Sequence, residues 1–325
     1  MSNHRSWIWH NALLSNPWWK TYAPMQIRDA LTSAELAEVT AKSDLRATWL
    51  LGCNVLIVAL AFALAALWPN PLTVVLAVAL LGARQLGFGI LMHEAGHRLL
   101  FRSRAVNEWV GTWLIAPPAF GNMAAYMRGH LDHHRLAGTD DDPDLANYRD
   151  YPIPRSRLRR KLWRDISGQT GWKTVQRIVL GLRHLPRLDA EMRASLLRGV
   201  GFNVLLLGLL VALGQGWLYL LWVVAFICVN PLVSRIRQVG EHAAVPDRLA
   251  ADPRRNTRTI VPSYLARLFI CPHQVSYHLE HHLLPSVPIY RLRRLHELLR
   301  GKGFYGDVDF PRGYLPLLRA VTVPG

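Results

Sequence analysis

Acidic residues and cysteines are scarce in this chain of 325 residues, and each shortage narrows its possible roles. There are 22 Asp and Glu against 38 Lys and Arg, which gives a net charge of +16. The cysteines Cys53, Cys228 and Cys271 form no spaced motif, so we expect a reducing compartment, no disulfides and no iron–sulfur cluster. We find no Gly-x-Gly-x-x-Gly in a strand–helix context, which argues against a bound dinucleotide. No nucleic-acid-binding motif accompanies the positive charge, so we expect no nucleic-acid partner.

Two long segments have no charged residue at all. They extend from Ala47 to Ala83 and from Gly199 to Ser234, and turn residues break each near its middle: Pro69-Asn70-Pro71 and Gly214-Gln215-Gly216. A membrane-spanning helix needs about 20 apolar residues. Each segment can therefore hold two spans, which we place at about 48–68, 72–92, 199–213 and 217–235. Buried helices of a soluble protein are the alternative, but two such long uncharged segments are unusual in soluble domains.

The basic residues predict the orientation in the membrane. Nearly every Lys and Arg lies in 1–46, in 93–198 or after Ser234, whereas the two turns carry no charge. By the positive-inside rule, both termini and the segments 93–198 and 236–325 are expected in the cytoplasm. Basic clusters such as Arg155–Lys161 either contact anionic lipid or only fix this topology.

We therefore predict one membrane-embedded domain over 1–325, with a helical cytoplasmic cap. Its first residues show no cleavable signal-peptide pattern. They contain Trp7, Trp9, Trp18, Trp19 and Tyr22, which is typical of an interfacial segment. The apolar stretch 109–120 is too short to span, so we expect it to be re-entrant or interfacial.

Three clusters hold eight of the fourteen histidines: His93 and His97; His130, His133 and His134; His278, His281 and His282. Residues three and four apart share one face of a helix, so each cluster can aim two or three imidazoles at one point. Imidazole suits iron and zinc, and eight ring nitrogens are too many for one tetrahedral zinc. The clusters predict a site for two metal ions, with all eight ligands on the same side of the membrane.

His242 follows the fourth predicted span within two turns, which makes it a candidate ninth ligand; a lone surface histidine is the alternative. We expect His4, His10 and His184 to be solvated, His273 not to bind metal, and His296 to lie on an amphipathic surface helix.

Several charged residues accompany these histidines. Glu94, Asp132, Glu280 and the run Asp140–Asp144 can accept the outer N–H of a ligand, or can lie at helix ends and in loops. Arg84 falls inside the second predicted span, where a charge is costly. It either pairs near Glu94, lines a polar pocket, or shows that the predicted span is misplaced.

The three clusters resemble the histidine boxes of the integral-membrane fatty acid desaturase superfamily, which also contains hydroxylases and carotenoid oxygenases. The boxes occur in the family's order, as His-x-x-x-His and then His-x-x-His-His twice. The stretch from Tyr277 to Pro288 is especially similar to the third box. The resemblance is recognisable from about His93 to Leu299.

This resemblance implies an all-α fold with four transmembrane helices as two hairpins and a cytoplasmic cap. It implies a non-haem centre of two iron ions held by His93, His97, His130, His133, His134, His278, His281 and His282, with His242 as the additional ligand. Some relatives have Asn where this chain has Gln238. The implied reaction is the O2-dependent introduction of a double bond into a fatty acyl or other membrane-lipid substrate, with hydroxylation as a close alternative. The electrons would come from a separate donor such as a ferredoxin, docked on the basic face.

The sequence also allows two other interpretations. His93-Glu-Ala-Gly-His97 also matches the His-Glu-x-x-His motif of zinc proteases, with Glu94 as general base. That interpretation leaves both His-x-x-His-His clusters unexplained. A metal transporter would place its ligands near the middle of the membrane, whereas these clusters lie outside the predicted spans.

Overall fold

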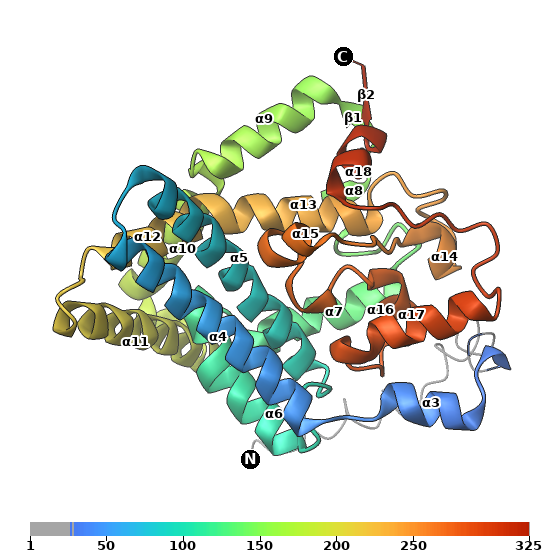
Figure 1. The fold of residues 1–325 in the computed structure, drawn as a ribbon, viewed down its shortest axis with the longest axis horizontal. Helices are drawn as coiled ribbons and strands as arrows, with labels where there is room; N and C mark the ends of the chain where they lie inside the picture. Colours follow the sequence, from blue (N-terminus) through green and yellow to red (C-terminus); the bar gives the residue numbers. More distant parts are fainter. Residues whose placement is uncertain (1–26, 28, 325) are drawn as a thin grey trace.

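The computed structural model describes residues 27 and 29–324, and within them the chain is almost entirely helical (Figure 1). The strands of this part are β1 (Ile153–Pro154) and β2 (Thr322–Val323), which pair in parallel. The predicted all-α class is therefore confirmed. The aromatic residues 7–22, with His4 and His10, lie outside the described residues.

Four helices of the described chain are long and apolar enough to cross a membrane. They are α4 (Asp44–Leu67), α5 (Pro71–Gly96), α11 (Ala190–Ala212) and the continuous helix Leu218–His242. The last comprises α12 (Leu218–Val224), the π-helical turn η5 (Ala225–Val229) and α13 (Asn230–His242). The predicted number of spans is confirmed.

Local sequence signals explain where the first hairpin begins and turns. The Ser43 side chain accepts the amide of Arg46 and so caps α4. Asn70 accepts the amides of Leu72 and Thr73, and Pro71 occupies the first turn of α5, where its missing N–H costs nothing. The short turn places α4 and α5 side by side (Figure 1).

The four helices differ in what surrounds them. In its most apolar stretch α5 is 61% buried, whereas each of the other three is 22% buried. On those three, large apolar side chains such as Leu60, Leu205 and Leu220 are exposed. Apolar surface on this scale is what a lipid-facing helix presents. We infer that α5 is the central helix and that α4 and α11 face lipid.

Three helices extend beyond the predicted spans. The helix α11 begins at Ala190 instead of about 199, α5 continues to Gly96, and the fourth helix continues to His242. The predicted spans cover the most apolar part of each helix, and a helix can continue beyond the apolar layer. In α11 the Arg198 guanidinium lies 5.1 Å from the ring centre of Trp113, so this charge has a cation–π partner.

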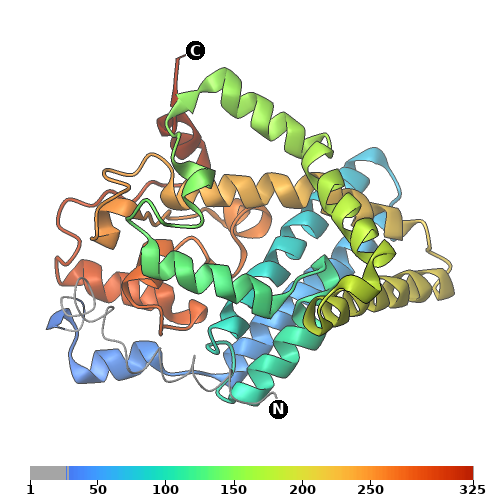
Figure 2. The same ribbon diagram turned by 180° about the vertical axis from the view of Figure 1, so that it is seen from behind.

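The remaining helices form the cap and the connections to it. Figure 2 shows the same ribbon from behind, with α7 running below α13. In chain order these elements are α3 (Ser33–Thr40), α6 (Arg104–Val110), η2 (Gly111–Ile115), η3 (Pro117–Ala119), α7 (Met123–Leu136), α8 (Leu145–Tyr148), α9 (Arg155–Ile166), α10 (Gln169–Arg183), η4 (Leu185–Arg187), α14 (Pro253–Asn256), α15 (Tyr264–Phe269), η6 (Pro272–Gln274), α16 (His278–Leu283), η7 (Ile289–Arg291), α17 (Leu292–Gly301) and α18 (Tyr314–Ala320).

The stretch 109–120 is not a span. It forms the end of α6, the π-helical η2 and the short η3, and η2 packs against α5. Trp109 and Trp113 are exposed on it, which fits the expected interfacial position.

Candidate metal centre

Four helices from distant parts of the chain carry the nine predicted ligands to one place. His93 lies in the last turn of α5, His97 directly follows that helix, and α13 ends with His242. α7 carries the second histidine cluster and α16 the third. The site lies where the ends of the membrane helices α5 and α13 meet the cap helices α7 and α16 (Figures 1 and 2).

The nine histidines form two groups, within each of which the ligand atoms lie within 4.8 Å of one another. The five-histidine group contains His93, His97, His130, His134 and His281, and the four-histidine group contains His133, His242, His278 and His282. α7 contributes to both groups, because His130 and His134 share one face of the helix and His133 points elsewhere. The structure thus brings together every predicted ligand; that they bind metal stays a prediction.

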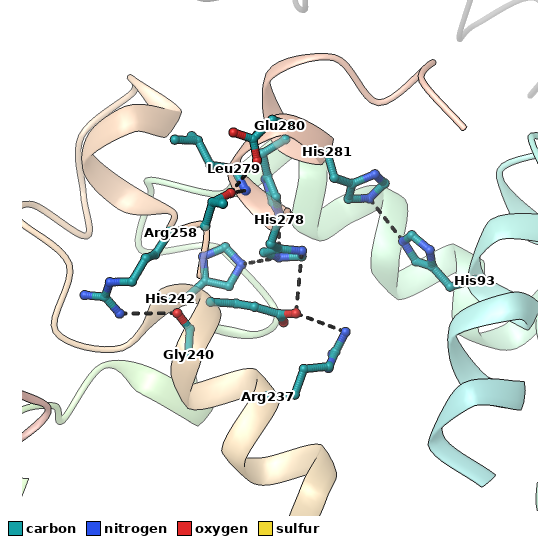
Figure 3. Close-up of polar contacts among 12 residues, drawn as sticks. His93, Arg237, Gly240, His242, Arg258, His278, Leu279, Glu280 and His281 are labelled. Atoms are coloured by element: carbon teal, nitrogen blue, oxygen red, sulfur yellow. Dashed lines mark hydrogen bonds and ion pairs between the residues drawn. The ribbon is translucent and has the colours of Figure 1, made fainter. Parts of the chain in front are cut away.

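The inward nitrogen atoms are very close. In the five-histidine group the His93 and His130 Nε2 atoms are 2.7 Å apart, and those of His93 and His281 are 3.1 Å apart. In the four-histidine group the Nε2 atoms of His242 and His278 are 3.0 Å apart (Figure 3). Converging lone pairs repel one another unless a proton or a cation lies between them. This arrangement suits a metal ion in each group.

Burial favours the neutral form of most of these rings, and metal ligands must be neutral. It lowers the pKa of His97 to about 4. It also lowers the pKa of His130, His134 and the three histidines of α16 well below 6.5, and neighbouring imidazoles lower it further. Neutral imidazoles, with no carboxylate bound directly to the metal, are a donor set that iron and zinc accept. The residues present therefore fit two such ions.

Asp142 supports the four-histidine group. Its Oδ1 lies 2.8 Å from His133 Nδ1 and accepts the amide of Asp144 at 2.8 Å, while Tyr148 donates its hydroxyl to the other oxygen. Burial alone would raise the pKa of Asp142, but the hydrogen bonds, first that of His133, keep it below its usual range. Within the run Asp140–Asp144, Asp142 is thus the residue that accepts the outer N–H of a predicted ligand, as expected. Asp140 and Asp141 are exposed.

Glu280 holds the third histidine cluster in place through residues that are not predicted ligands. This fully buried carboxylate accepts hydroxyl hydrogen bonds from Thr259 and Tyr305, and His296 Nδ1 lies 2.7 Å from its Oε1. The prediction that His296 lies on the surface is wrong. Its helix α17 is amphipathic, but His296 is on the buried face.

Two acidic residues of the clusters have hydrogen-bond or ion-pair partners other than the ligand rings. Glu94 is buried and accepts the Ile289 amide at 2.8 Å, so it fixes η7 beside the site. Asp132 is exposed and pairs with Arg135.

Arg84 and His273 belong to a different polar cluster inside the first hairpin. Arg84 is buried and donates to the Leu268 carbonyl at 2.6 Å, so it neither pairs with Glu94 nor shows a misplaced span. His273 Nε2 lies 3.1 Å from Asn54 Oδ1, and the Asn54 amide donates to the Arg84 carbonyl. His273 is thus no ligand, as expected, but it ties η6 to the membrane helices five residues before His278.

A cavity of about 50 Å³ borders both groups. It is large enough for a few small molecules such as water or O2, and too small for an acyl chain. Polar side chains line much of it: Tyr126, Asp144, Tyr148, Arg237, Gln238 and Glu241. Gln238 therefore faces the space beside the rings.

Sequence reasoning missed several of these residues. Tyr148, Thr259 and Tyr305 have no signal in the linear pattern, because their partners lie 6, 21 and 25 residues away. Arg237 and Glu241 lie one helical turn apart on the helix that ends with His242. This spacing predicts an ion pair beside a candidate ligand, so both residues could have been found from the sequence.

Comparison with known proteins agrees with this architecture. The family model described as Fatty acid desaturase matches residues 69–312. The chain therefore belongs to the fatty acid desaturase family, whose members are oxidoreductases. Its four helices that are able to cross a membrane agree with this family.

The curated relatives are diverse. The chain is 26% identical over 235 residues to a dihydrorhizobitoxine desaturase of Bradyrhizobium elkanii, covering 69% of this chain and 66% of that protein. It is 30% identical over 274 residues to a beta-carotene ketolase of a Paracoccus species, covering 79% and 95%. It is 23% identical to a sphingolipid delta(4)-desaturase DES1-like protein of Oryza sativa subsp. japonica, covering 64% and 58%.

Proposed function

We propose that this protein is an O2-dependent desaturase that introduces a double bond into a fatty acyl chain at a centre of two iron ions. The single observation that carries the proposal is the division of nine histidines into two groups with converging Nε2 atoms. The family match supports the reaction class. The iron ions would supply the oxidising power that an unactivated methylene group requires.

The chain's own residues hold, orient and enclose this centre. The nine imidazoles would bind the two ions, and Asp142, Asn256 and Glu280 fix the rings or the helix that carries them. The apolar surfaces of α4 and α11 support a position of the site next to lipid. For desaturation, –CH2–CH2– and O2 with two electrons and two protons give –CH=CH– and two water molecules.

The two electrons require a separate donor. The helix α9 carries six basic residues, five of them in Arg155–Lys161, and we propose that this surface binds an acidic carrier such as a ferredoxin on the cytoplasmic side. Turnover with a purified carrier should then fall as salt rises past about 0.1 M, where the screening length is about 10 Å. Turnover that is independent of salt would contradict this docking surface.

Oxygen insertion is the second candidate, and one observation favours it. The ketolase relative aligns over 95% of its own length, more than the 66% of the dihydrorhizobitoxine desaturase. A ketone or alcohol product on a hydrophobic substrate would fit the same centre.

Lipid analysis tests both candidates. Lipids from cells that express the wild-type protein or His133→Ala are compared by gas chromatography–mass spectrometry. We expect new unsaturated acyl chains with the wild type alone. Hydroxylated or ketone products would favour oxygen insertion. An unchanged lipid profile, with protein that contains iron and receives electrons, would refute acyl desaturation.

A further inference from the structure

The two histidine groups differ in what contacts the outer face of their rings. Ligand imidazoles usually donate their second N–H to a carboxylate or a carbonyl, and this partner fixes the tautomer and the ring orientation. In the four-histidine group, three of the four rings have a carboxylate or carbonyl oxygen near the outer nitrogen, Nδ1. In the five-histidine group, no ring has a hydrogen-bonded carboxylate or carbonyl oxygen among residues 27 and 29–324.

His133 has the most complete support. Asp142 Oδ1 lies 2.8 Å from its Nδ1, and both side chains are almost wholly buried. The carboxylate is held in turn by the Asp144 amide and by the Tyr148 hydroxyl. With its Nδ1–H bound to a fixed carboxylate, His133 must present the Nε2 lone pair to the interior of its group.

The neighbours of His133 are also oriented. His242 Nδ1 lies 3.1 Å from the Asn256 carbonyl oxygen, which requires the same tautomer. His278 Nδ1 lies 3.7 Å from Glu241 Oε1, and Arg237 Nη1 contacts that carboxylate at 3.1 Å (Figure 3). The Glu241 charge is thus balanced by Arg237, whereas Asp142 has no Lys or Arg side chain in contact among the described residues.

From this asymmetry we infer that Asp142, held by Tyr148, is a positioning residue for only one of the two metal ions, the ion of the four-histidine group. The inference rests on the proposed two-metal centre. A carboxylate partner of this kind typically changes metal affinity by about 10- to 100-fold. Because Asp142 contacts no ring of the five-histidine group, the affinity of that group should be unchanged.

The test is the iron content of purified protein reconstituted with 57Fe(II) at limiting concentration. The wild type should hold two irons per chain and show two Mössbauer components. Asp142→Asn keeps the side-chain size but removes the charge, so we expect about 10- to 100-fold weaker binding of one iron and the loss of one component. Tyr148→Phe keeps the carboxylate and should weaken the same site by a smaller factor.

The matched control is Asp132→Asn. Asp132 lies on the same histidine-bearing helix, is exposed, and pairs only with Arg135, so this variant should keep both irons. Equal loss of both irons in a folded Asp142→Asn protein, or no loss at all, overturns the inference about Asp142. Neither result contradicts the proposal that the wild-type protein holds two irons. A wild-type protein that binds no iron, or a single zinc, overturns the proposed function itself.

Discussion

Replacing Glu280 by alanine should destabilise the protein and empty the metal centre, although Glu280 touches none of the nine predicted ligands. The carboxylate joins the third histidine cluster to Thr259, His296 and Tyr305, all of which are buried. Without it, three buried donors lose their acceptor. Each unsatisfied buried group costs about 1–3 kcal/mol. We take about 3–5 kcal/mol in total, since water entering the space left by the side chain can satisfy some of these donors.

Glu280→Gln should be much milder. The amide oxygen can still accept from His296 and Tyr305, which share Oε1. The amide N–H2 then faces Thr259, whose hydroxyl can accept instead of donate, although it already accepts the Leu279 amide. We expect a cost of about 1 kcal/mol, the net value of one hydrogen bond.

Thermal unfolding of the detergent-solubilised protein measures the difference. At about 2 °C per kcal/mol, Tm should fall by about 6–10 °C in Glu280→Ala and by about 2 °C in Glu280→Gln. Glu297→Ala is the control, because Glu297 lies on the same helix as His296 in an exposed pair with Arg293 and should change stability by less than about 1 kcal/mol. Equal Tm values for Glu280→Ala and Glu297→Ala would refute the reasoning.

Two further outcomes follow from the hairpin and from the buried histidines. Gly87→Ala should destabilise the protein by about 1–3 kcal/mol, because a Cβ there would meet Asn54 Oδ1 at 2.2 Å, whereas Gly89→Ala has open space and should be neutral or stabilising by thermal unfolding. Metal-free protein should lose stability as the pH falls below about 6.5, the ordinary pKa of an unfolded histidine. Burial lowers the folded pKa of His97 to about 4 and of His273 to about 3, so protons bind the unfolded chain first. The loss should continue down to about pH 3–4, and a Tm that is constant between about pH 7 and pH 5 would contradict it.

The spans could be predicted from sequence because absence of charge over more than thirty residues has few explanations. Their ends could not, since Glu191, Arg193 and Arg198 lie on α11 itself. A helix that continues past the apolar layer keeps its backbone hydrogen bonds, so charge marks the edge of that layer and not the end of the helix.

The histidine cluster could also be predicted, but its internal division could not. The spacing in α7 shows that His130 and His134 share a face, but the partners of that face depend on how α5 and α16 pack against it. His296 shows the same limit in a different way. The pattern of α17 correctly indicates an amphipathic helix, yet only the packing of Tyr277 and Phe310 against His296 shows that it lies on the buried face.

The most direct test of the account is metal analysis of the purified protein, combined with X-ray absorption at the iron edge. The account predicts two irons per chain, each surrounded by imidazole nitrogen, and the loss of both signals in a variant that lacks the histidines of α16. One zinc per chain would favour the protease interpretation, and iron bound mainly by carboxylate oxygen would contradict the histidine-only centre.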